Sequence, residues 1–173
     1  MIIQFCGMSG AGKTTLAEHT KAALELQHIP IEILDADEYR RSLFKDLGFS
    51  KADRMENIRR LAFLANKFSS QNIIPIICAI NPYKEVRKEV KEKYPGVKTI
   101  FIDCPLPELI KRDTKGLYKK ALLPEGHADK ISNLTGINDP FEIPENPDIV
   151  IHTDTEDIIA SANKIVEFIK FNG

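Results

Sequence analysis

The sequence predicts an α/β fold of three layers, in which a mostly parallel five-stranded sheet lies between helices. Two observations predict it. Five short apolar runs recur along the 173 residues, and segments with a helical period separate them. Strands that are apolar throughout suit a parallel sheet that helices cover on both faces. The expected strands are residues 2–6, 31–34, 73–80, 98–102 and 148–152.

Four helices are expected between and after these strands. Their apolar side chains recur every three or four residues, which is typical of a helix with one buried face. Pro82 precedes the third of these segments and suits the start of a short helix. The segments with this spacing are residues 16–24, 55–68, 86–90 and 158–169.

The composition excludes several classes of protein. There are 24 Lys and Arg residues against 25 Asp and Glu residues, and such a balanced chain binds nucleic acid or anionic membranes poorly through its overall charge. The longest apolar run is too short to span a bilayer. Cys6, Cys78 and Cys104 lack disulfide or zinc spacing and are expected to be buried free thiols. We therefore expect one cytoplasmic domain, residues 1–173, with no nucleic-acid or membrane partner.

The first expected strand runs directly into a glycine-rich phosphate-binding loop. The motif G-x-x-x-x-G-K-[ST] is matched by Gly7, Met8, Ser9, Gly10, Ala11, Gly12, Lys13 and Thr14, with Thr15 next. Backbone N–H groups and a helix N-terminus favour phosphate in this setting. Lys13 is expected to bridge the β- and γ-phosphates of ATP, and Thr14 to bind Mg²⁺. The motif alone is compatible with hydrolysis, switching or phosphoryl transfer.

Two carboxylates and a cation follow the second expected strand. They are Asp35, Asp37 and Arg40. Ligands of doubly wound sheets lie beyond the carboxyl ends of the strands, so one carboxylate could accept a proton from an acceptor hydroxyl or hold a magnesium-bound water. The alternative interpretation makes one of them the N-cap of a helix over residues 38–44.

A second group of polar side chains precedes and opens the long helix. Ser50 and Asp53 have capping-box spacing. Arg54 and Asn57 lie three residues apart and therefore share a helix face. Arginine suits phosphate or sulfate, and Phe49 could stack on a base.

Residues 114–147 have little periodicity and many Gly and Pro residues. Loops of this length in a domain are usually functional or disordered. Lys115, Lys119 and Lys120, with Tyr118 between them, favour a lid that covers phosphates and excludes water.

At this point the chain resembles the adenylyl-sulfate (APS) kinase family over nearly its whole length. The matching segments are the phosphate loop, Asp35-Ala-Asp37-x-x-Arg40, Leu47-Gly-Phe-Ser50-x-x-Asp53-Arg54-x-Glu-Asn57-Ile-Arg-Arg60, Asn81-Pro-Tyr-Lys84, Arg112-Asp113-x-Lys115-Gly-Leu-Tyr-Lys-Lys120-Ala, Leu134-Thr-Gly-Ile-Asn-Asp-Pro-Phe-Glu142 and Pro144-Glu-Asn-Pro147. The resemblance implies a P-loop kinase fold with a lid, transfer from ATP with Mg²⁺ to the 3′-hydroxyl of adenylyl sulfate in sulfate assimilation, and a homodimer.

The resemblance also implies roles for particular residues. Lys13 and Asp35 would be catalytic, Thr14 and Asp35 would hold the metal, and Arg112 would contact the ATP base. The implied acceptor contacts are Asp37, Arg40, Phe49, Arg54, Asn57, Ile80, Asn81, Lys115 and Leu134.

Several positions depart from the family pattern, which leaves the acceptor open. Ala36 replaces glycine and Lys84 replaces arginine. Asn81 replaces a serine proposed to carry a phosphoryl group, so direct transfer is expected. Leu134 replaces the phenylalanine that stacks on the acceptor adenine opposite Phe49, and residues 123–129 add to the lid. The alternatives are a kinase acting on another nucleotide conjugate, such as a cytidine-linked phosphoramidate, and a nucleotide-binding regulator without turnover.

Overall fold

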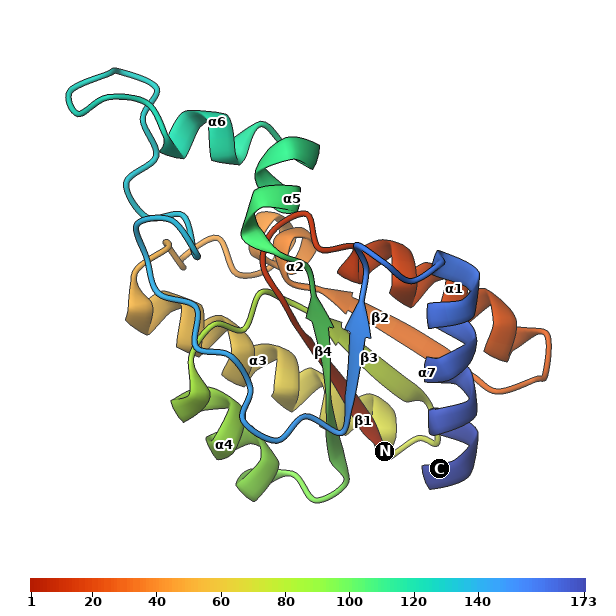
Figure 1. The fold of residues 1–173 in the computed structure, drawn as a ribbon. Helices are drawn as coiled ribbons and strands as arrows, with labels where there is room; N and C mark the ends of the chain where they lie inside the picture. Colours follow the sequence, from red (N-terminus) through yellow and green to blue (C-terminus); the bar gives the residue numbers. More distant parts are fainter.

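The computed structural model describes residues 1–173, and a five-stranded sheet forms its centre (Figure 1). The strand order is β2-β3-β1-β4-β5, and every neighbouring pair is parallel. The strands are β1 (Ile2–Cys6), β2 (Ile31–Asp35), β3 (Ile74–Cys78), β4 (Val97–Asp103) and β5 (Ile149–His152). The predicted fold class is confirmed, and the sheet is wholly rather than mostly parallel.

Two layers of helices cover the sheet. α1 (Lys13–Glu25) and α7 (Ile158–Asn172) pack on one face, and α3 (Lys51–Ser69) and α4 (Lys84–Lys93) pack on the other (Figure 1). All four predicted helices are present. Their periodic apolar residues are buried, so the sequence pattern marks the two hydrophobic cores.

Three short helices complete the structure: α2 (Ala36–Ser42), α5 (Leu106–Arg112) and α6 (Leu117–Ala121). The helix expected over residues 38–44 begins two residues earlier because the Asp35 side chain accepts from the N–H groups of Asp37 and Glu38. α5 was not predicted, and α6 lies within the segment expected to lack regular structure.

Asp113 explains how α6 forms in that segment. Its carboxylate accepts hydrogen bonds from the backbone N–H groups of Tyr118 and Lys119, at 3.0 and 2.9 Å. These donors belong to the first turn of α6 and have no partner within the helix. The cap thereby fixes a five-residue helix that lacks a periodic pattern of its own.

The three cysteines are buried and free, as predicted. None of the helices is long and apolar enough to cross a membrane. The carboxyl ends of the strands lead into the phosphate loop, α2, residues 79–83 and α5, so these four segments meet along one edge of the sheet (Figure 1).

Candidate active site

The phosphate loop lies between β1 and the N-terminus of α1 and borders a cavity of about 270 Å³. Gly7 passes so close to β4 that a Cβ atom there would collide with the carbonyl oxygen of Ile102. Gly12 adopts φ 92° at the N-cap of α1, a conformation that favours glycine. Six of the nine predicted loop residues line the cavity: Ser9, Gly10, Gly12, Lys13, Thr14 and Thr15.

Lys13 folds back onto the loop. Its Nζ donates hydrogen bonds to the carbonyl oxygens of Gly7 and Met8, both at 2.8 Å. Burial disfavours the ammonium and lowers the pKa of Lys13 to about 8. The loop thus holds a cation whose charge phosphate oxygens would stabilise.

Asp35 and Thr14 meet at the mouth of this cavity. The Thr14 hydroxyl donates to Asp35 Oδ2 at 2.9 Å, while Asp35 Oδ1 accepts the two N–H groups that start α2. The alternative interpretation of Asp35 as an N-cap is therefore correct, and the second oxygen stays beside the predicted metal-binding hydroxyl.

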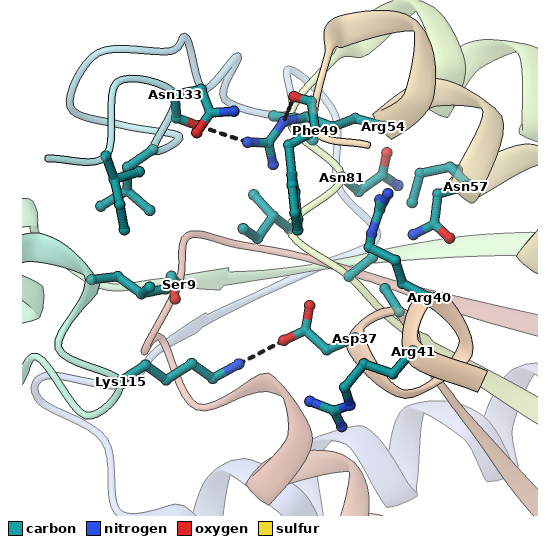
Figure 2. Close-up of a pocket in the computed structure, with 18 residues that line it drawn as sticks. Ser9, Asp37, Arg40, Arg41, Phe49, Arg54, Asn57, Asn81, Lys115 and Asn133 are labelled. Atoms are coloured by element: carbon teal, nitrogen blue, oxygen red, sulfur yellow. Dashed lines mark hydrogen bonds and ion pairs between the residues drawn. The ribbon is translucent and has the colours of Figure 1, made fainter. Parts of the chain in front are cut away.

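A second, larger cavity of about 570 Å³ adjoins the first. Its walls come from α2, α3, the segment after β3 and residues 115–134 (Figure 2). All nine predicted acceptor residues line it: Asp37, Arg40, Phe49, Arg54, Asn57, Ile80, Asn81, Lys115 and Leu134.

Two arginines of this cavity are oriented by backbone carbonyls. Arg40 donates to the carbonyl oxygens of Leu47 and Gly48, and its guanidinium lies 4.8 Å from the centre of the Phe49 ring. Arg54 donates to the carbonyl oxygens of Phe49 and Asn133, at 2.9 and 2.7 Å (Figure 2). Both cations are thereby fixed next to an aromatic face.

Asp37 and Lys115 form an ion pair of 2.7 Å where the two cavities meet (Figure 2). Burial opposes ionisation of Asp37, but its contact with Lys115 outweighs this effect and lowers the pKa of the carboxyl below its usual value. Six residues line both cavities: Ser9, Ala36, Asp37, Ala79, Ile80 and Lys115. This shared wall joins the phosphate loop to the larger cavity.

Other predicted residues lie elsewhere. Gly7, Met8, Ala11 and Arg112 do not line the phosphate-loop cavity. Arg112 instead donates to the carbonyl oxygen of Thr153 at 2.8 Å.

Tyr118, which stands between the lysines of the expected lid, is buried. Tyr118 is 1% exposed, and its hydroxyl donates to the carbonyl oxygen of Ser9 at 2.8 Å. It therefore belongs to the core beneath the phosphate loop. Of the three lysines in this segment, only Lys115 lines either cavity.

Sequence reasoning also missed part of the larger cavity. Apart from the wall that it shares with the phosphate-loop cavity, the additional residues that line it are Arg41, Ile58, Pro82, Leu117, Ile131 and Asn133. Arg41 directly follows Arg40 in the sequence, and this position could have indicated that Arg41 lines the same cavity. No side-chain pattern indicates Asn133, because it contributes a backbone oxygen.

Comparisons with known proteins place this geometry in a family. The family model described as adenylylsulphate kinase matches residues 1–152. The chain belongs to the adenylyl-sulfate kinase family. A curated adenylyl-sulfate kinase from Gloeothece citriformis is 43% identical over 164 residues, which cover 95% of this chain and 90% of the relative.

Two solved members of the adenylyl-sulfate kinase family share the fold. The APS kinase of Mycobacterium tuberculosis in complex with AMPPNP and APS has a TM-score of 0.90 and 34% identity, covering 98% of this chain and 96% of that one. A hexameric APS kinase from Thiobacillus denitrificans has a TM-score of 0.69 and 28% identity, covering 99% of this chain and 29% of that longer one.

Asn81 stands where the family pattern has serine, and its surroundings explain why asparagine fits there. Its backbone has φ 49°, which asparagine tolerates better than most residues. Its Nδ2 donates to Gln4 Oε1 at 3.2 Å, and Gln4 in turn donates to Thr99. The amide thus extends a buried polar network across β1 and β4 and offers no hydroxyl that a phosphoryl group could modify.

Proposed function

We propose that this chain transfers the γ-phosphoryl group of ATP to the 3′-hydroxyl of adenylyl sulfate. The observation that carries the proposal is the shared wall, which places the larger cavity, with all nine acceptor residues, directly beside the phosphate loop. A donor and an acceptor held on either side of Asp37 would meet without a covalent enzyme intermediate.

The donor would bind in the phosphate loop, with its charge opposed by backbone N–H groups and by Lys13. Mg²⁺ fits here because Thr14 and Asp35 bring a hydroxyl and a carboxylate together at the cavity, and Mg²⁺ usually takes only one or two protein oxygens beside phosphates and water. When bound, it would neutralise charge on the phosphate oxygens. Arg112 would contact the base from outside the cavity wall.

The acceptor would bind in the larger cavity. Arg40, Arg54 and Asn57 offer N–H donors to the phosphate–sulfate anion. Phe49 offers an aromatic face to the base, and Leu134 lies on the lid side of the same cavity. An aliphatic wall there would pack against the base without the stacking that a second ring supplies.

Asp37 is better placed than Asp35 to receive the proton of the acceptor hydroxyl. Asp37 lines both cavities, whereas Asp35 lines only the phosphate-loop cavity. In the transfer, the bond from the γ-phosphorus to the β–γ bridging oxygen breaks, a bond to the acceptor oxygen forms, and the hydroxyl proton passes to Asp37. Asp35 would then act through Mg²⁺ and by fixing the start of α2.

Residues 114–147 would serve as the lid. Arg54 bonds to the Asn133 carbonyl, and Lys115 pairs with Asp37, so these two contacts join the segment to α3 and α2. We also propose that the chain assembles as a homodimer, which a sedimentation measurement would test.

A coupled assay with purified protein tests the function. We expect ADP release with adenylyl sulfate as acceptor and formation of the 3′-phosphorylated product, and loss of both in Lys13→Ala, because that variant lacks the cation at the phosphates. Turnover of only a cytidine-linked phosphoramidate would overturn the assignment of the acceptor. ATP binding without turnover of either compound would favour the regulator.

A further inference from the structure

Four cations line the larger cavity: Arg40, Arg41, Arg54 and Lys115. The protein itself already binds three of them, since Arg40 and Arg54 donate to backbone carbonyls and Lys115 pairs with Asp37. The fourth, Arg41, makes no hydrogen bond and no ion pair within 4.0 Å. Arg41 is therefore the one cation of the cavity whose donors are all without a partner in the protein.

Arg41 lies at the end of the cavity where the phosphoryl group would move. It follows Asp37 by four residues on α2, so the two side chains share one face of the helix. Figure 2 shows its guanidinium beside Asp37 and on the far side of the cavity from Phe49 and Asn133. This position separates Arg41 from the residues that would hold the acceptor base.

The charge balance at this end of the cavity leaves a role for another cation. Before transfer Lys115 is paired with Asp37, and Lys13 lies in the phosphate-loop cavity and does not line the larger one. Phosphoryl transfer spreads negative charge over three equatorial oxygens, and a guanidinium can contact two of them at once.

We infer that Arg41 is a further catalytic residue, whose guanidinium binds the phosphoryl group during its transfer. The inference rests on the proposed function. The Arg41 guanidinium would contact the equatorial oxygens of the phosphoryl group while the bond to the β–γ bridging oxygen breaks and the bond to the acceptor oxygen forms. When ADP and the phosphorylated acceptor dissociate, the Arg41 side chain is again without a bound anion.

Steady-state kinetics of three variants test the inference. In Arg41→Ala we expect kcat to fall about 10- to 100-fold, with the KM values of ATP and adenylyl sulfate within about threefold of wild type. Arg41→Lys should recover part of the loss, because it keeps the charge without the planar fork. Lys45→Ala removes a nearby exposed positive charge that lines neither cavity, and should leave kcat unchanged.

A binding measurement separates this role from a general effect of charge. Arg41→Ala should weaken binding of ADP–aluminium fluoride in the presence of adenylyl sulfate, and should leave AMPPNP binding unchanged. Wild-type kcat in Arg41→Ala, or equal loss of both affinities, would overturn the inference. Absence of wild-type turnover would instead overturn the proposed function.

Discussion

Lys13 lies in the phosphate loop, where burial makes its ammonium less stable than in water. The loop surrounds its ammonium with two carbonyl oxygens and little water, and burial lowers its pKa to about 8. Below pH 8 the free protein holds Lys13 protonated, and above pH 8 mostly neutral. Phosphates favour the protonated form, so they should raise this pKa again.

ATP binding should therefore take up a proton at alkaline pH. At pH 9 we expect close to one proton per ATP and a weaker affinity than at pH 7, because the bound state must first recharge Lys13. Calorimetry in two buffers of different ionisation enthalpy measures the uptake. In Lys13→Met the uptake should vanish, and its persistence would mean that another group titrates.

Arg54 joins residues 114–147, the proposed lid, to α3 and also lines the larger cavity. Arg54→Ala should raise the KM for adenylyl sulfate about 10- to 100-fold, because charge-assisted hydrogen bonds contribute roughly 1.5–3 kcal/mol. The KM for ATP should hardly change. Arg59→Ala is the matched control, since Arg59 lies on the same helix but binds Glu89 and lines neither cavity. A changed ATP affinity with an unchanged acceptor KM would place Arg54 at the donor instead.

Among the elements, α3 depends on its N-terminus to position the acceptor residues. The Ser50 hydroxyl accepts from the Asp53 N–H at 3.1 Å and donates to the Asp53 carboxylate at 2.7 Å. The helix therefore begins at Lys51, directly after Ser50, and Arg54 and Asn57 of its first two turns line the cavity.

Ser50→Ala should lower the free energy of unfolding by about 1 kcal/mol, the usual contribution of an N-cap. Urea denaturation measures the change. Ser70→Ala, at the other end of α3, removes a hydroxyl that bonds only the Lys67 carbonyl, and should cost less than about 0.5 kcal/mol. Equal effects of the two substitutions would contradict the capping role.

Most of the helices and strands could be predicted from the sequence. Strands and long helices carry their own periodicity, and the capping spacing of Ser50 and Asp53 is local, so both were predictable. α5 and α6 were not, because seven and five residues are too few for a periodic pattern. The place of Tyr118 beneath the phosphate loop was not predictable either, because the residue stands among lysines in a segment without periodicity.

At the scale of the whole molecule, the gathering of the acceptor residues in one cavity depends on the sheet. β2 and β3 are neighbours, so their carboxyl ends bring residues 36–41 and 79–82 together. The family resemblance predicted which residues would meet. It did not predict Arg41, which the family motif leaves unassigned, or the Asn133 carbonyl, whose position depends on the path of the lid.

The lid should respond to both substrates together. We expect amide hydrogen exchange over residues 122–133 to slow when AMPPNP and adenylyl sulfate are both present, because most of these residues are exposed in the free protein. Exchange in β1 should stay the same. The Lys13→Ala variant should show no such slowing, and equal protection with and without ligands would exclude closure of this segment.

The shared wall of six residues has a thermodynamic consequence. Any shift of this wall that one substrate induces changes the cavity that binds the other substrate. Linkage requires that the factor by which ATP alters the affinity for adenylyl sulfate equals the factor by which adenylyl sulfate alters the affinity for ATP. The proposed placement of the two nucleotides on either side of this wall thus predicts heterotropic coupling within a single chain.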